Sequence, residues 1–429
     1  MKKLFNFMHR FKPSLLREFS FYSNSFYLMI DSICGAVLGF VFWFAAARIF
    51  NTESVGLSSA LISAISLLSF IAGLGLDDGL IRYLPSALDK GKIFNNVLSL
   101  TGIAGIISGI IFILGIPFWS PALMIIHRNL AYAAAFTMLI TIYVYYVMLG
   151  AAFISFKRAD FQLGRTLVFQ LGKMVIIIGV ASVLGSFGIL FSWGIAIMLA
   201  TIFGLFYFLP RLIGNYRPVL KIDRSIDKEM IRFALTNYFS GALANMPSWI
   251  LPLLIINLLG ATSNAQFFIG WSVGSIVTAI PFSISTSVYA EGSNQIESMR
   301  KNLKKSVVLI ILLLIPSEII MFIFAHFILS FFGSAYANGG TYTLRLIALS
   351  AIPSSVTLLY LALVQVQKHL SQIILVSGGN AIGILLFGYA FVRIFGIDGA
   401  SIACLLSDTL IAIGVAPFLL KYLITKELR

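Results

Sequence analysis

Apolar runs of about 20 residues alternate along the chain with short polar segments. A hydrocarbon core of about 30 Å needs about 20 helical residues to cross it, and in lipid every backbone polar group must bond within its own segment. The pattern therefore predicts membrane-spanning helices. We place twelve of them, at residues 25–47, 55–77, 93–118, 131–154, 165–186, 188–210, 234–259, 264–289, 304–331, 341–364, 371–395 and 399–421.

One long polar stretch divides these runs into two sets of six. Six is an even number, so the second set enters the membrane in the same orientation as the first, which predicts a parallel repeat about an axis along the membrane normal. The expected fold is an all-α polytopic membrane protein, with twelve transmembrane helices in two six-helix lobes around a central cavity. The expected regions are a basic cytoplasmic N-terminal segment, a first lobe, a basic cytoplasmic linker and a second lobe, at residues 1–24, 25–210, 211–233 and 234–429.

A repeated hairpin supports the two-lobe organisation. The stretch Trp43–Pro85 has two apolar runs with charged residues at their ends, as expected for a helical hairpin in a membrane. A similar stretch follows at Ile255–Ser293. In an ungapped alignment of the two, the polar corner Asn51–Ser54 falls on Gly260–Ser263. The two corners are therefore predicted to occupy equivalent places in the two lobes.

Composition and charge agree with a membrane protein. The chain is 59% hydrophobic and 11% charged, whereas soluble proteins carry about 25% charged residues. Cytoplasmic loops concentrate Lys and Arg, and most of the 30 such residues fall on the loops that share a side with the N-terminus. Lys157, Arg158 and Arg165 are assigned to the loop after the fourth span. The exceptions are Arg48, Arg128 and Arg393 on the opposite side, and Lys173 and Arg345 within spans.

This bias predicts a multi-pass protein of the cytoplasmic membrane with both termini cytoplasmic. It also accounts for the net charge of +14, so we expect no nucleic-acid partner. The loops between spans are too short for a catalytic domain, and Gly73–Gly79 lacks the glycine spacing of a phosphate-binding loop. Cys34 and Cys404 lie within apolar runs. We predict no catalytic residue, metal site or cofactor, and an energy source that is an ion gradient, the membrane potential or the substrate's own gradient.

Three segments resemble a known family: FWFAAARIFNTESVG from Phe42, GLGLDDGLIRYLP from Gly73, and the stretch from LGATSNAQFFIGWSV to SVYAEGS that begins at Leu259. They are similar to the polysaccharide transporter family, the oligosaccharide-lipid flippases of the multidrug/oligosaccharidyl-lipid/polysaccharide flippase superfamily. The resemblance implies two V-shaped lobes around a central cavity that opens alternately to each side. It also implies transport of isoprenoid-linked sugars from the cytoplasmic to the outer leaflet, for surface polysaccharide or glycoprotein assembly.

The predicted function is accordingly that of a flippase for an oligosaccharide linked to an isoprenoid phosphate or diphosphate, and not that of an enzyme. One alternative is an ion-coupled multidrug exporter of the same superfamily. Another is a membrane-embedded glycan polymerase or glycosyltransferase, against which the short loops argue. The expected partners are the lipid-linked oligosaccharide and membrane lipids, with H⁺ or Na⁺ as candidate coupling ions and other polysaccharide assembly proteins as candidate partners.

Cations near or within the spans are candidates to bind the substrate's phosphate, because an unpaired charge in an apolar slab costs several kcal/mol. The candidate substrate-binding residues are Arg48, Arg82, Lys173 and Arg345, with Arg393 as a further candidate. Arg48, Arg82 and Arg393 lie near span ends, where an interfacial anchor is the alternative role. Lys173 and Arg345 lie deeper, where ionisable residues usually face a polar interior.

Acids within the spans are candidates for ion coupling. Asp31, Glu318 and Asp408 could each bind a proton or Na⁺, or could neutralise a neighbouring cation as a structural pair. The sequence leaves both roles open. The hairpin alignment also places Arg82 on Glu291, at the cytoplasmic ends of equivalent spans. We therefore predict that these two residues form a gate that pairs when the cytoplasmic side closes.

Overall fold

The computed structural model describes residues 13–180, 187–214, 216–219, 228–294 and 299–425. The parts of the predicted N-terminal segment, fifth span, linker and C-terminus that fall on residues 1–12, 181–186, 220–227 and 426–429 lie outside this description. The described chain is helical, without strands, and twelve of its helical segments are long and apolar enough to span a membrane. The predicted count of twelve spans is therefore confirmed.

The first bundle contains the helices of the N-terminal half. They are α2 (Pro13–Ile49), α3 (Thr52–Gly73), α4 (Leu76–Tyr83), α5 (Lys90–Trp119), α6 (Met124–Arg128), α7 (Leu130–Ser155), α8 (Ala159–Val180), α9 (Gly188–Phe203) and α10 (Leu209–Leu212). A 3₁₀ turn, η1 (Pro121–Leu123), precedes α6, and a π-helical turn, η3 (Gly204–Phe208), joins α9 to α10. Apolar side chains face the interior of this bundle, with Phe42, Ile65 and Ile140 fully buried.

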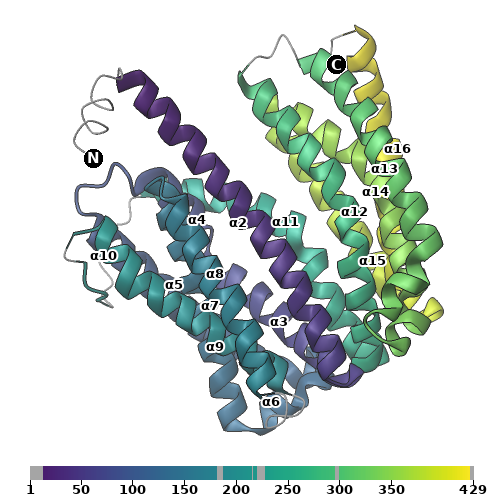
Figure 1. Ribbon diagram of the computed structural model, residues 1–429, viewed down its shortest axis with the longest axis horizontal. Helices are drawn as coiled ribbons and strands as arrows, with labels where there is room; N and C mark the ends of the chain where they lie inside the picture. Colours follow the sequence, from purple (N-terminus) through teal and green to yellow (C-terminus); the bar gives the residue numbers. More distant parts are fainter. Residues whose placement is uncertain (1–12, 181–186, 215, 220–227, 295–298, 426–429) are drawn as a thin grey trace, which may run out of the picture.

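The second bundle contains six long helices. They are α11 (Lys228–Leu259), α12 (Ala261–Asn294), α13 (Met299–Ser330), α14 (Ser334–Val366), α15 (Leu370–Phe395) and α16 (Ile397–Thr425). The two bundles spread apart towards the end that holds the start of α2 and the end of α16 (Figure 1). The molecule thus has the predicted V shape of two lobes.

The two lobes repeat the same hairpin in the same register. α3 begins at Thr52 and α12 at Ala261, which are the residues that the sequence alignment pairs. In the first lobe the Asn51 side chain caps α3 by accepting from the Ser54 N–H at 2.8 Å. In the second lobe Gly260 makes the corner with a φ of 88°, a conformation that glycine adopts without strain. The parallel repeat is therefore confirmed.

The two hairpins also hold the lobes together. The Nδ2 atom of Asn264 on α12 donates to the backbone oxygen of Gly56 at 2.8 Å and to the Ser59 Oγ at 3.0 Å, both on α3. A Cβ at Gly56 would lie 1.7 Å from the backbone oxygen of Ala261. Only glycine permits this close approach of the helices. The narrow end of the V is thus a packed junction of the corners at which α3 and α12 begin.

The repeat differs at the other end of the hairpin. α3 stops at Gly73, and the left-handed residues Leu74 (φ 54°) and Gly75 (φ 70°) turn the chain into α4. The second span therefore ends earlier than the predicted residue 77. In the second lobe α12 continues without a break to Asn294. A Cβ at Gly75 would lie 2.4 Å from the backbone oxygen of Ala234, so the turn packs against the first part of α11.

Candidate functional site

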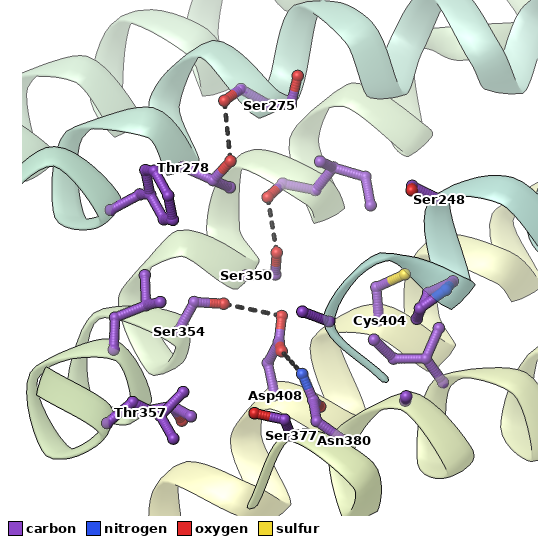
Figure 2. A pocket seen from close by; sticks show the side chains of 18 of the residues that line it. Ser248, Ser275, Thr278, Ser350, Ser354, Thr357, Ser377, Asn380, Cys404 and Asp408 are labelled. Carbon is purple, nitrogen blue, oxygen red and sulfur yellow. Dashed lines mark hydrogen bonds between the residues drawn. The ribbon is translucent and has the colours of Figure 1, made fainter. Parts of the chain in front are cut away.

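A cavity of about 420 Å³ lies within the second lobe, between α11, α12, α14, α15 and α16. Its lining combines apolar side chains with hydroxyl groups and one carboxylate, that of Asp408 (Figure 2). Asp408 is 9% exposed. Ser354 of α14 and Asn380 of α15 point towards this carboxylate from the neighbouring helices. Three spans thus meet at one buried acid.

Neutral groups hold the Asp408 carboxylate. The Ser354 Oγ donates to its Oδ2 atom at 2.9 Å, and the Asn380 Nδ2 donates to its Oδ1 atom, also at 2.9 Å. The Ser407 Oγ donates to the Asn380 Oδ1 at 2.8 Å, which fixes the orientation of the amide. Within the described residues, no Lys, Arg or His forms an ion pair with Asp408. The carboxylate is therefore oriented but its charge is not balanced by a cation of the protein.

This arrangement can take up a small cation. A carboxylate that leaves water loses solvation, and it recovers stability by binding a proton or a metal ion. The carboxylate, hydroxyl and amide oxygens around Asp408 are the hard ligands that ions such as Na⁺ prefer. The arrangement is thus chemically suited to hold a small cation.

The first lobe also holds an acid among its helices, the half-buried Asp31, and a cation lies close to it. Arg165 on α8 is 1% exposed, and its Nη2 donates to the Gln162 Oε1 at 2.8 Å. The Gln162 Nε2 in turn donates to the Asp31 Oδ2 on α2 at 3.3 Å. The guanidinium lies 3.8 Å from the centre of the Tyr146 ring and also donates to the Tyr146 backbone oxygen. Gln162 thus links a half-buried anion to a buried cation.

The structure corrects the assignment of Arg165 to a cytoplasmic loop. α8 begins at Ala159, six residues before the predicted start of the fifth span, so Arg165 lies inside the lobe. The start of the fifth span was predicted too late because Arg165 is charged. A hydropathy pattern assigns an arginine to a loop when the groups that bind it inside the protein are not known. The signal that the sequence did contain is the spacing of Gln162, Thr166, Gln170 and Lys173, which places polar side chains on one face of a helix.

Lys173 follows on the same face of α8. It is 4% exposed, and its Nζ lies 4.6 Å from the centre of the Phe42 ring on α2 and 4.8 Å from that of Phe169. Two aromatic faces therefore stabilise this cation by their quadrupoles. One turn away, the Gln170 Nε2 donates to the Gly35 backbone oxygen on α2 at 3.0 Å. Lys173 belongs to a polar seam between α2 and α8.

Other sequence-predicted cations lie apart from both buried acids. Arg48 is exposed at the end of α2, and its Nε donates to the backbone oxygen of Phe331, just beyond α13. It thus bridges the two lobes at the narrow end of the V. The Arg345 Nε donates to the Phe322 backbone oxygen at 2.9 Å, so this side chain joins α14 to α13.

The remaining cations sit against aromatic rings near helix ends. The exposed guanidinium of Arg82 on α4 lies 4.4 Å from the centre of the Phe233 ring on α11. That of Arg393 lies 4.1 Å from the ring centre of Tyr389 on the same helix. Both residues lie in the last turns of their helices, Arg82 on α4 and Arg393 on α15.

The remaining acids are not paired with these cations. Glu318 is half-buried on α13, and its Oε1 has no hydrogen-bond partner among the described residues. Glu291 is exposed on the last turns of α12. In the part of the chain that the structure describes, no ion pair joins Glu291 to Arg82. The predicted gate is therefore not formed in this conformation, and its role in another conformation stays a prediction.

Comparison with known proteins identifies the relatives of this arrangement. Residues 21–290 match the family described as polysaccharide biosynthesis protein, and residues 238–392 match the MatE family. A comparison with curated protein sequences found no match.

Among solved structures, the lipid II flippase MurJ in an inward closed conformation aligns with a TM-score of 0.72 at 12% identity, over 91% of this chain and 87% of that chain. An inward-facing multidrug resistance MATE family transporter of the MOP superfamily aligns with a TM-score of 0.67 at 14% identity, over 89% and 92%. A MOP superfamily transporter from Pyrococcus furiosus Vc1 (DSM3638) aligns with a TM-score of 0.57 at 14% identity, over 93% of each chain. At these identities the likeness establishes the fold.

Proposed function

The chain belongs to the polysaccharide biosynthesis protein family, and from this premise we propose that it is a flippase for a lipid-linked oligosaccharide. It would move an oligosaccharide on an isoprenoid phosphate or diphosphate from the cytoplasmic to the outer leaflet of the cytoplasmic membrane. The observation that carries the proposal is the family match over residues 21–290, which covers the first lobe and the hairpin that joins it to the second. The V-shaped arrangement of two lobes suits alternating access (Figure 1).

Ion coupling is the second part of the proposal. Asp408 is the proposed coupling site, because neutral donors orient its carboxylate without neutralising it. Asp31 is proposed as a structural pair, since Gln162 connects it to Arg165. Glu318 remains a second candidate for ion binding, because its buried Oε1 is unpartnered among the described residues. A proton or Na⁺ at Asp408 would lower the cost of burying its charge and so favour one conformation of the second lobe.

The substrate's phosphate needs cations along its path. Arg82 and Arg48 lie at opposite ends of the α3–α4 segment and are accessible to solvent or lipid headgroups. Lys173 is buried and could bind phosphate only after α2 and α8 separate, whereas Arg345 is partly exposed and joins α14 to α13. We propose Arg82 as the first contact of the phosphate, with Arg48, Lys173 and Arg345 as later contacts.

A transport assay tests the function directly. The purified protein, reconstituted in liposomes, is given a fluorescent lipid-linked sugar, and its appearance in the opposite leaflet is measured by quenching from outside. Movement without formation of a glycosidic bond is expected. Chain growth would instead support a polymerase or glycosyltransferase.

A multidrug exporter is the second candidate, and the MatE match over residues 238–392 favours it. This match includes Asn380 but ends before Asp408. An exporter should move a cationic dye such as ethidium against its gradient in the same liposomes. Dye transport without movement of the lipid-linked sugar would replace the flippase proposal.

Cysteine labelling tests the proposed orientation, in which both termini are cytoplasmic. Cys34 and Cys404 are first replaced by Ser. A cysteine at Ser86, between α4 and α5, should then react only from the cytoplasmic side, and one at Asn129, between α6 and α7, only from outside. Reaction of both from the same side would contradict the orientation.

A further inference from the structure

A small pocket of about 120 Å³ lies where the two lobes meet, away from the Asp408 cavity. Side chains of α3, α4 and α7 in the first lobe form most of it. Among the described residues that line it, Trp249 on α11 is the one that comes from the second lobe. The pocket is therefore shared between parts of the protein that alternating access would move relative to each other.

Aromatic rings form one side of this junction. The ring of Phe70 on α3 stacks on that of Tyr238 on α11, with ring centres 4.8 Å apart and an angle of 12° between the planes. On α11, Trp249 lies 4.9 Å from Phe70 at an angle of 41°. Phe70 and Trp249 both line the pocket. Aromatic rings thus provide a flat apolar wall that spans the two lobes.

Polar groups stand on the remaining sides of the pocket. Ser66 and Tyr143 are hydrogen-bonded to each other. The Ser69 Oγ donates to the Ile140 backbone oxygen at 3.0 Å, which leaves its lone pairs able to accept. The carboxylate of Asp77 enters from the first turn of α4. The pocket therefore offers several acceptors and hydroxyl donors beside an aromatic wall.

The carboxylate of Asp77 is partly buried. α4 follows the candidate span that ends at Gly73. Burial raises the pKa of Asp77, while backbone N–H groups of Asp78 and of Asp77 itself hold it down. A ligand that supplies hydroxyl donors would replace some of the solvation that this carboxylate loses.

We propose that this pocket binds one sugar ring of the transported glycan. A sugar ring has an apolar face of C–H groups, which suits an aromatic wall, and a rim of hydroxyls, which suits carboxylate and hydroxyl partners. The pocket is small, so the site takes a single ring partly inserted rather than a chain. The inference rests on the proposed flippase function and adds a recognition site for the glycan, distinct from any cation that binds phosphate.

The position of Trp249 gives the site a role in the transport cycle. A ring held between Trp249 and Asp77 contacts both lobes at once. Any movement that carries α11 away from α3 and α4 would remove Trp249 and weaken the site. The glycan would then be bound in one conformation and released in the other, as a difference in affinity between two states requires.

Sugar binding can be measured without transport. The probes are the methyl glycosides of glucose, galactose, mannose and N-acetylglucosamine, added to the protein in lipid nanodiscs while tryptophan fluorescence is recorded. At least one should change the emission saturably, with a half-saturation on the order of 1 mM for so small a ligand. Trp249→Phe should abolish the change. The control Trp119→Phe, at the exposed end of α5, should leave it intact.

A pair of transport probes then tests the link to flipping. One is a fluorescent short-chain isoprenoid diphosphate that carries N-acetylglucosamine, and the other is the same lipid without sugar. Asp77→Asn and Trp249→Ala should each slow the sugar-bearing probe about tenfold, the effect of losing one good contact, and leave the bare lipid unchanged. The matched control is Asp78→Asn, because Asp78 is the neighbouring acid on α4 but does not line the pocket.

The outcomes separate the two proposals. If no glycoside changes the fluorescence, or if the change persists in Trp249→Phe, the sugar site is wrong even when flipping occurs. Equal slowing of both lipid probes by Asp77→Asn would likewise overturn it, because the residue would then act on the lobes and not on the sugar. If sugars bind through Trp249 but the wild-type protein moves neither lipid, the flippase proposal fails while the sugar site stands.

Discussion

Each lobe holds a carboxylate among its helices, half-buried at Asp31 and buried at Asp408, but the two lobes balance its charge differently. In the first lobe Gln162 connects Asp31 to the buried Arg165, so an anion and a cation share one hydrogen-bonded chain. In the second lobe the partners of Asp408 are the hydroxyl of Ser354 and the amide of Asn380, which are neutral. A carboxylate that already lies near a cation of the protein gains little stability from binding another cation. A carboxylate held only by neutral hydrogen-bond donors gains much more.

The Asp31 and Asp408 sites, which the sequence did not distinguish, are therefore suited to different roles. Removing one of two opposite charges that are linked inside a lobe leaves the other uncompensated at high cost, so the α2–α8 seam is suited to keeping the first lobe in one arrangement. The proposed binding and release of an ion at Asp408 would change the charge of that site, so the site is suited to driving a change in the second lobe. The lobes repeat in register at Thr52 and Ala261, yet their buried polar groups do not repeat.

The largest predicted effect is at Arg165. Replacing it with Met leaves Asp31 without its cation and should lower the free energy of unfolding by about 3–5 kcal/mol, measured by thermal unfolding in detergent. The double variant Asp31→Asn, Arg165→Met should recover most of this loss, because both charges are then removed. Arg128→Met is the matched control, since Arg128 is exposed at the end of α6. If Arg165→Met is no worse than this control, Arg165 does not stabilise the seam by balancing the charge of Asp31.

The next effect concerns ion affinity and not stability. Asp408→Asn removes the charge that would attract a cation but keeps an amide of nearly the same shape. It should weaken cation dependence by about 100-fold, since a charged contact contributes up to about 3 kcal/mol. The readout is the Na⁺ or H⁺ concentration that half-activates transport in liposomes. Asp31→Asn serves as the comparison and should move this midpoint little; a larger shift for Asp31→Asn would reverse the roles of the two lobes.

The comparison also explains what sequence reasoning could and could not predict. Helix positions follow from local hydropathy, so the starts of α3 and α12 could be paired from the alignment alone. Arg165 was assigned to a loop although Gln162 lies three residues away on the same helix, because its other partner, the Tyr146 backbone oxygen, is on α7 and becomes visible only once α7 and α8 pack together. Asp408 was singled out as an intramembrane acid, but no local pattern shows that Ser354 lies beside it, because the two residues are on different spans.

A smaller effect is expected from the neutral ligands of Asp408. Ser354→Ala and Asn380→Ala each remove one hydrogen bond to the carboxylate, which is worth about 1 kcal/mol, or roughly fivefold in cation affinity. The same half-activation measurement in liposomes should show both shifts in the same direction as Asp408→Asn but much smaller. Ser377→Ala, which also lines the cavity, is the control. Shifts as large as that of Asp408→Asn would mean that the hydroxyl and amide bind the ion directly.

The smallest effect is expected at the wide end of the V, where charge would be balanced in one conformation only. Arg82 and Glu291 are exposed and unpaired with each other here, and an exposed pair contributes about 0–1 kcal/mol. If they meet when the lobes close, Arg82→Glu should favour the open form and speed thiol modification of Ser248→Cys, whose serine is exposed in the second-lobe cavity. Adding Glu291→Arg should restore the original rate. The Arg82–Glu291 pair would then differ from the Asp31 and Asp408 sites, because its two charges attract each other only in the closed state. The energy of this attraction would shift the equilibrium between the open and closed forms towards the closed form. Strictly additive effects in the double-mutant cycle would show that the two residues do not interact, and that each only anchors its own helix at the headgroups.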